Sequence, residues 1–409
     1  MKRTEMDRER DSVRALFLIS LSVLLASSVW FSGTAAAPVL KKIWGLSDVQ
    51  SSWLTISVQL GFITGTFLYA LLNLADIFNS RKVFFFSALF GAAFNAALAL
   101  TADGLSTALT FRFFTGMALA GIYPVGMKIV TQWFRSGLGW RLGVMVGALT
   151  LGTAVPYLIF AIGAEIPWRY LMIAASVLAA FGGGIVFLGV PDGPYLRESP
   201  PFDIRAAFRI FKFRQFRLQA FGYFGHMWEL YSFWGLISFY LAASLSRRTA
   251  HFSNALPLIS FLAIGFGIFG CVGGGWISRW IGEKTVALAS LAASGFFCAL
   301  SGFIFDLSPT LLVILALLWG VVVVSDSPQF SALAALYCPP EYTGTAFTIQ
   351  NGIGFGITVI SIQFIAWVSG YVGWRWAFVF LAVGPLLGSV SLARLFRSSK
   401  EGLSAKPVM

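Results

Sequence analysis

The sequence predicts an all-α integral membrane protein with twelve transmembrane helices in two pseudo-symmetric six-helix bundles. Of its 409 residues, 57% are hydrophobic and only 11% are charged, with a mean hydropathy of +0.80, whereas soluble domains carry about 25% charged residues. The apolar residues form runs of the roughly 20 residues that a bilayer-spanning helix needs. The second half of the chain also repeats the first. Together these observations exclude a soluble enzyme and a disordered chain.

The apolar runs define twelve candidate spans joined mostly by short loops. A helix satisfies its own backbone hydrogen bonds in lipid, and the ten-residue alternating segments of a β-barrel are not found. The first run has no cleavage pattern typical of a signal peptide, so we expect a retained helix. The spans lie at 15–38, 50–74, 83–101, 105–132, 142–164, 169–190, 218–242, 255–277, 285–305, 309–336, 345–369 and 374–394.

The net charge is +12, and the Lys and Arg residues behind it fall mostly on one side of the membrane if the N-terminus is cytoplasmic. Twenty-one of the 29 Lys and Arg then lie inside, six lie outside, and two lie within a span. Cytoplasmic loops of membrane proteins carry such an excess. We therefore expect both termini in the cytoplasm and a bacterial inner membrane. Because the basic residues are spread over many loops, they do not indicate a nucleic-acid partner.

The longest polar stretch, residues 191–217, interleaves Phe with Arg and Lys. This pattern is typical of an amphipathic helix on the cytoplasmic leaflet. It predicts an N-terminal six-helix bundle over 1–190, a cytoplasmic linker over 191–217, and a C-terminal six-helix bundle with a short tail over 218–409.

Distinctive residues recur in corresponding spans of the two halves. Parallel repeats of this kind build transporters with a substrate site near mid-membrane between the halves. At a shift of 204 the pairs are Trp30 with Trp234, Gly61 with Gly265, Gly116 with Gly320, Pro124 with Pro328 and Gly152 with Gly356, and at a shift of 206 Trp168-Arg169 meets Trp374-Arg375.

The chain resembles the major facilitator superfamily over essentially its whole length. That family carries Gly-x-x-x-Asp-Arg-x-Gly-Arg-Arg after span two, and here Asp76 and Arg81 match it, while Leu72 replaces the first glycine. The second-half copy keeps both glycines but has Arg279 at the acidic position. In the family this motif helps to control the conformational switch, so the resemblance implies that role for Asp76, Arg81 and Arg279.

Two further features of the resemblance concern coupling and substrate. Arg112 and Gly116 are similar to the Arg-x-x-x-Gly pattern of span four, which is often tied to proton coupling. Gly152 and Pro156 lie near the exporter-associated motif of span five, but the Gly-Pro pair is missing. Nitrate porters of the superfamily carry an Arg in spans two and eight; neither span has one here, which disfavours nitrate.

Five ionisable residues lie inside spans and away from the span ends. Such a group costs about 2.5–3.5 kcal/mol on insertion scales, so it is commonly functional. All five fall in spans four, seven and ten, which line the central cavity of the superfamily, and none has an ionisable counterpart in the other half. They are Arg112, Lys128, His226, Glu229 and Asp326.

His226 and Glu229 are three residues apart, so they share a helix face. We expect this pair to take up and release a proton, together with Asp326 and Arg112. The structural alternatives are a hydrogen-bonded lock of span seven, a pairing of Asp326 with Lys128 or Arg112, and neutralisation of Glu229 by Arg112. Lys128 lies towards the cytoplasmic end, where it can also snorkel.

Other polar and aromatic residues of the cavity spans are candidates for shaping the pocket. Arg112 and Tyr123 are eleven residues apart, about 20° on a helical wheel, so we expect them to face the cavity together. The further candidates are Trp30, Gln59, Trp228, Tyr231, Trp234, Gln329, Gln350 and Asn351.

The sequence therefore predicts a secondary active transporter, a proton-coupled symporter that moves a small polar or anionic organic solute by alternating access. The alternatives are a proton-driven exporter of drugs or toxic compounds, and a non-transporting membrane sensor or structural subunit. No catalytic set, metal-ligand spacing or ATP-binding loop is found, so we expect no enzyme activity and no cofactor. The expected partners are the solute, protons and lipid, and the expected state is a monomer.

Overall fold

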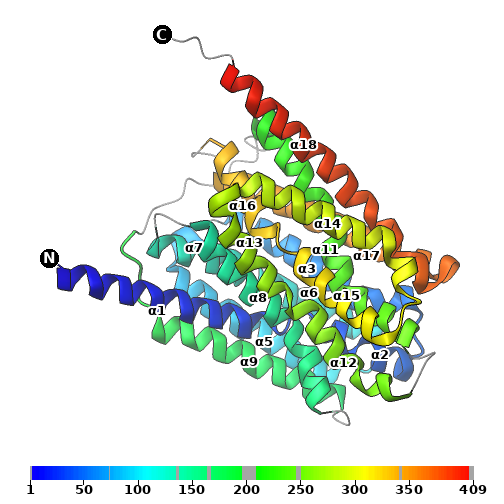
Figure 1. The fold of residues 1–409 in the computed structure, drawn as a ribbon. Coiled ribbons are helices and arrows are strands. Elements are labelled where there is room, and N and C mark those ends of the chain that lie inside the picture. The colour runs from blue at the N-terminus through cyan, green and yellow to red at the C-terminus, as the bar shows by residue number, and fades with distance from the viewer. Residues whose placement is uncertain are drawn as a thin grey trace.

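A computed structural model describes residues 2–72, 74–134, 138–163, 167–195, 209–245, 250–339 and 343–404, which are helical almost throughout (Figure 1). The helices are α1 (Lys2–Ser27), α2 (Ser32–Trp44), α3 (Asp48–Leu71), α4 (Leu74–Ile77), α5 (Ser80–Thr101), α6 (Leu105–Leu119), α7 (Tyr123–Trp133), α8 (Leu138–Ile162), α9 (Trp168–Gly189), α11 (Arg214–Leu245), α12 (Ala250–Gly265), α13 (Gly267–Ile281), α14 (Glu283–Ile304), α15 (Pro309–Val322), α16 (Ser327–Tyr337), α17 (Thr343–Ala377), the 3₁₀ helix η2 (Phe378–Ala382) and α18 (Val383–Ser404).

Ten helical segments of the described chain are long and apolar enough to cross a membrane, two fewer than the twelve predicted spans. α11 is not among them, because polar residues such as His226 and Glu229 lower its hydropathy. The segment Thr345–Arg397 counts once, although Gly373, at φ 71°, interrupts the helical backbone within α17. This interruption lies where the sequence predicts the boundary between its last two spans.

In three of the predicted spans, three or four residues separate two helices. α1 and α2 are separated by residues 28–31, α6 and α7 by 120–122, and α15 and α16 by 323–326. The second and third breaks are 204 residues apart, and each is followed by a proline in the first turn, Pro124 or Pro328. Proline has no N–H to donate, and in the first turn of a helix that donor would have no intrahelical partner. The first break has no counterpart, because α11 runs straight through.

Local signals set other helix ends. The Ser47 hydroxyl accepts the Gln50 N–H at 3.1 Å while the Ser47 N–H donates to the Gln50 side chain at 2.9 Å, a capping box that begins α3. Gly45 ends α2 in the left-handed conformation, and Gly282, also at positive φ, separates α13 from α14.

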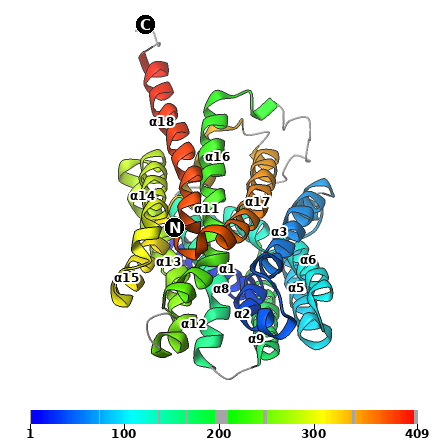
Figure 2. The ribbon, with the colours of Figure 1, turned by 90° about the vertical axis from the view of Figure 1, so that its right-hand side faces the viewer.

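The helices before residue 190 pack mainly with one another, and so do those after residue 209. Figure 2 shows α3, α5 and α6 on one side of the molecule and α13, α14 and α15 on the other. The two groups meet along two seams, one between α3 and α17 and one between α8 and the pair α12 and α13. The Ser52 hydroxyl donates to the Gln363 side chain at 2.9 Å across the first seam.

Two predictions fall partly outside the described residues. Of the linker 191–217, where the amphipathic helix is expected, residues 196–208 lie outside the described part. The side chain of Asp76 is likewise outside it, although the backbone of Asp76 belongs to α4. The division into bundles at 190 and 218 stays a prediction.

Candidate functional site

A small cavity lies between the two groups of helices. Its volume is about 40 Å³, whereas pockets for drug-sized ligands measure about 300–1,000 Å³. The cavity in this structure is therefore too small for a drug-sized ligand. α7 and α8 form one wall, and α11, α16 and α17 form most of the other. The lining residues, none of them charged, are Tyr123, Met127, Val146, Leu149, Tyr223, Met227, Leu230, Tyr231, Trp234, Val324, Ser327, Ser331, Asn351 and Phe355.

Four of the residues predicted to shape the pocket thus line the cavity, namely Tyr123, Tyr231, Trp234 and Asn351. Asn351 also accepts a hydrogen bond from the Tyr223 hydroxyl at 2.9 Å, which joins α11 to α17. Trp30 lies beside the cavity, where its ring packs against Tyr231 at 5.8 Å between centroids. The polar groups of the lining residues are hydroxyls, an amide and the indole N–H of Trp234, with no cation and no carboxylate.

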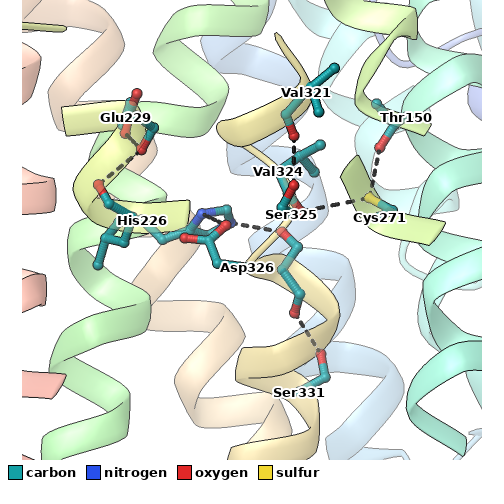
Figure 3. Close-up of polar contacts among 12 residues, drawn as sticks. Thr150, His226, Glu229, Cys271, Val321, Val324, Ser325, Asp326 and Ser331 are labelled. Atoms are coloured by element: carbon teal, nitrogen blue, oxygen red, sulfur yellow. Dashed lines mark hydrogen bonds and ion pairs between the residues drawn. The ribbon is translucent and has the colours of Figure 1, made fainter. Parts of the chain in front are cut away.

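The His226 and Asp326 side chains form a buried pair next to the cavity (Figure 3). Nδ1 of His226 lies 2.9 Å from Oδ1 of Asp326, with 2% and 1% of the two side chains exposed. Nε2 of His226 lies 2.8 Å from the hydroxyl of Ser327 at the start of α16. Within the described residues neither carboxylate oxygen of Asp326 receives a well-aligned hydrogen bond, despite the short separation. Asp326 is thus paired with His226 and not with Lys128 or Arg112.

Glu229 is buried in the second group of helices, facing α14 and α15. Its carboxylate accepts hydrogen bonds from the Ser294 hydroxyl at 2.8 Å, the Cys298 thiol at 3.2 Å and the Trp319 indole at 3.0 Å. In the described part of the chain no cation forms an ion pair with it. Residues three apart on a helix point about 60° apart, and this divergence sends His226 to α16 and Glu229 to α14. The structure does not bring these two side chains together as a pair.

Arg112 is fully buried at the break between α1 and α2. A helix break frees backbone carbonyls, which need donors inside a membrane protein. The guanidinium supplies them and contacts neither Glu229 nor the cavity lining. Its partners are the carbonyls of Val29 (2.7 Å), Trp30 and Leu54 (3.2 Å), the Ser32 hydroxyl (3.2 Å) and the Asn95 side chain (3.3 Å).

Arg112 and Tyr123 do not share a face, contrary to the expectation from their spacing. The helical wheel assumes one continuous helix, and the chain breaks at 120–122 between them. Tyr123 therefore lines the cavity while Arg112 points into the first group of helices.

Four buried candidates carry polar groups without a hydrogen-bond partner in the described part of the chain. Both amide atoms of Gln329 and of Gln59 are unpaired, and so are the indole N–H groups of Trp30 and Trp234. Such orphan groups are rare and need a reason.

Lys128 is half-buried, one residue after the cavity residue Met127.

Two of the predicted switch residues, Arg81 and Arg279, do not line the cavity. The Arg81 guanidinium binds Asp192 through two bonds of 2.9 Å and donates to the Val190 carbonyl at 2.8 Å, fastening the end of α9 to the start of α5. Arg279 of α13 lies over the Trp140 ring of α8 at 5.4 Å, across a seam between the two groups of helices.

Several site residues were not expected from the sequence. Ser294, Cys298 and Trp319 surround Glu229, and Asn95 is bound to Arg112. The available signals were weak: Asn95 is the one amide in its span, and Ser294 and Cys298 are four residues apart on one helix face.

The sequence model of the Major Facilitator Superfamily matches residues 17–354 and 219–408. A probable nitrate/nitrite antiporter of Thermus thermophilus is 31% identical over 204 residues, 46% of this chain and 44% of that protein, so the match spans less than half of that relative. A 4-hydroxybenzoate transporter of Acinetobacter baylyi is 24% identical over 90% of this chain and 87% of its own.

The fold has a solved counterpart. The structure of a human organic anion transporter aligns with a TM-score of 0.68 over 93% of this chain and 99% of its own, at 16% sequence identity. At that identity the likeness concerns the fold alone.

Proposed function

The chain belongs to the Major Facilitator Superfamily and is a membrane transporter, not an enzyme; on this premise we propose that it carries a small polar or anionic organic solute by alternating access and is driven by protons. The cavity between the two groups of helices is the proposed binding site. It lies where pseudo-symmetric repeats place substrates in transporters. The proposal includes a bacterial inner membrane, cytoplasmic termini and a monomeric protein.

Twelve spans in two six-helix bundles are part of the proposal. α11 has 32 residues, more than enough to cross a bilayer despite its polar side chains. The positive φ of Gly373 divides the long last segment into two. Counting α11 and both parts of that segment raises the ten apolar segments to twelve, six on either side of the linker.

The environment of Glu229 is the observation that carries the proposed coupling. Its carboxyl group is 1% exposed and its three hydrogen-bond donors are all uncharged. A carboxylate without a cation is costly inside a membrane, and taking up a proton removes that cost. The His226 and Asp326 pair, one turn along α11, offers a second proton-binding group at the cavity wall. A proton taken up by Glu229 would alter the packing of α11 against α14 and α15.

The test is solute accumulation in proteoliposomes with and without an inward pH gradient. The probes are 4-hydroxybenzoate and niacin, the solutes named for two Acinetobacter baylyi relatives. Glu229→Gln keeps the size of the side chain and an acceptor for Trp319, so we expect solute exchange to continue while gradient-driven accumulation falls at least tenfold. Glu9→Gln, at an exposed position of α1, is the matched control. Undiminished accumulation by Glu229→Gln would remove Glu229 from the coupling mechanism.

Export is the second candidate for direction. Two fungal relatives, in Fusarium oxysporum and Gibberella moniliformis, are named efflux pumps, each matching 44% of this chain. The same proteoliposomes with the gradient reversed decide between import and export. A non-transporting sensor would show neither accumulation nor exchange.

A further inference from the structure

Aromatic rings from the two groups of helices pack directly against one another beside the central cavity. Trp30, Phe31 and Phe62 come from the first group, and Tyr231, Trp234 and Phe355 from the second; we call these six the aromatic wall. Five ring pairs cross between the groups. They are Trp30–Phe355 at 5.9 Å and Trp30–Tyr231 at 5.8 Å, Phe62–Phe355 at 4.4 Å, and Phe31–Tyr231 at 6.3 Å and Phe31–Trp234 at 6.1 Å.

In this structure the rings of the aromatic wall from one group of helices pack against those from the other. Ring pairs of this kind contribute about 0.5–1.5 kcal/mol each beyond the area they bury. Alternating access requires the two groups to separate at the cavity, so the ring faces of Trp30 and Phe62 must leave those of Tyr231 and Phe355. A flat ring entering between them would replace the lost stacking. A saturated ring of the same size is puckered and has no π-face.

Two N–H donors of the aromatic wall have no acceptor within the described part of the chain. The indole N–H groups of Trp30 and Trp234 are buried and unpaired among the described residues. Both rings contact Tyr231, at 5.8 and 5.2 Å, so the two donors flank one cavity residue. Indole can only donate, so the missing partner must be an acceptor atom. The amide of Gln329, one turn into α16, is similarly unpaired.

Three of the charged residues of the cavity spans are engaged elsewhere. Arg112 binds backbone carbonyls, Asp326 pairs with His226, and Glu229 faces α14 and α15. None of them lines the cavity. Recognition at this site therefore relies on stacking and on uncharged donors.

We infer that the transported solute is a planar aromatic or heteroaromatic molecule, held by its ring face in the aromatic wall and by an acceptor substituent at the Trp30 and Trp234 N–H groups. This inference rests on the proposed function and narrows its substrate class.

The test compares flat probes with their saturated counterparts on the purified protein. Benzamide and 4-hydroxybenzamide are set against cyclohexanecarboxamide and 4-hydroxycyclohexanecarboxamide, which keep the acceptor but lose the π-face. Binding is read from thermal stabilisation and from equilibrium dialysis of labelled probe. We expect at least one flat probe to bind ten times or more tightly than its saturated counterpart. Equal affinity within both pairs, or no binding by any probe, overturns the inference.

Variants assign the effect to the aromatic wall. Phe355→Leu removes one ring and Trp30→Phe removes one N–H while keeping a ring. Each should weaken flat-probe binding at least fivefold, whereas Trp280→Phe, at a ring that is 68% exposed, should not. If Phe355→Leu does not fold, Phe62→Leu replaces it. Unchanged affinity in the folded wall variants overturns the inference.

The two proposals fail separately. Gradient-driven accumulation without any preference for flat probes would leave the proposed function standing and remove the substrate class. Preferential binding of flat probes without gradient-driven accumulation would leave the substrate class standing and remove the proposed proton-driven transport.

Discussion

Arg112 illustrates how a buried charge can be structural. Its donors reach the Val29 and Trp30 carbonyls at the break between α1 and α2, and further acceptors on α2, α3 and α5 around that break. Its counterpart in the second half is Ala316, and there α11 has no break. The asymmetry that suggested a functional residue therefore follows the asymmetry of the backbone.

Arg112→Lys should destabilise the protein, although the charge is kept. An ammonium group cannot reach several acceptors in different directions, and each unsatisfied buried carbonyl costs about 1–3 kcal/mol. We expect a loss of about 2–4 kcal/mol, measured by thermal unfolding in detergent, with no loss for Arg10→Lys at an exposed position. A stable Arg112→Lys protein with weakened solute binding would instead indicate a binding role.

His226 and Asp326 should behave as a coupled pair in a double-mutant cycle. Removing one partner of a buried pair leaves the other uncompensated, at a cost of about 3–5 kcal/mol. We expect His226→Gln to destabilise the protein by about 3 kcal/mol, and adding Asp326→Asn to recover part of that loss. Additive effects of the two substitutions on unfolding free energy would show that the 2.9 Å contact is not energetically important.

Close helix crossings recur at corresponding positions of the two halves, whereas the ionisable residues inside the spans do not. A Cβ at Gly116 would overlap the Val58 carbonyl of α3, and a Cβ at Gly320 would overlap the Ala263 carbonyl of α12. These two contacts are equivalent under the repeat to within one residue. Small residues let helix backbones approach closely in membranes. Such positions serve the scaffold in both halves and therefore recur.

Gly116→Val should force α3 and α6 apart. Overpacked cores lose about 1–3 kcal/mol or more, and backbone against backbone leaves little room to adjust. The control is Gly356→Ala, since an added Cβ there meets nothing within 4 Å. In thermal unfolding, Gly116→Val should be less stable than Gly356→Ala. Equal stability of the two variants would contradict the close crossing of α3 and α6.

Repeated arginines also close corresponding helix ends. The Arg169 side chain donates to the Ala99 carbonyl at 2.8 Å near the end of α5, and Arg375 donates to the Gly302 carbonyl at 3.2 Å near the end of α14. Basic side chains commonly satisfy the last carbonyls of a helix in this way. The Trp-Arg repeat in the sequence thus has a structural reason.

At the scale of the whole molecule, the two groups of helices touch along α3 and α17 at both ends. Ser52 bonds Gln363 at one end, and Phe67 lies against Gly352 towards the other. With a cavity of about 40 Å³ between them, this arrangement fits an occluded step of a transport cycle.

A disulfide between Ser52→Cys and Gln363→Cys should arrest transport. Oxidation would fix α3 to α17 where they must separate, and reduction should restore the rate. The two single variants are the controls, and both should transport with or without oxidant. Full transport by the cross-linked protein, verified by mass spectrometry, would contradict separation at this seam.

Much of the fold could be predicted from composition and spacing. A bilayer-spanning helix needs a long apolar run, and a chain with an internal repeat uses the same scaffold residues in both halves. The residues of the site could be predicted only in part. Tyr123, Trp234 and Asn351 do line the cavity, but the positions of charged partners depend on where helices break. Breaks at 28–31 and 120–122 changed which way side chains point.

The sequence by itself determined an all-helical membrane transporter with two related halves, since hydropathy and repeats are properties of the chain alone. Only the tertiary structure decided that Arg112 serves a helix break, that Asp326 pairs with His226, and that Glu229 accepts its hydrogen bonds from uncharged donors. The physical reason is that a buried charge is compensated by whatever group folding brings within about 3 Å of it, and distance along the chain does not report that.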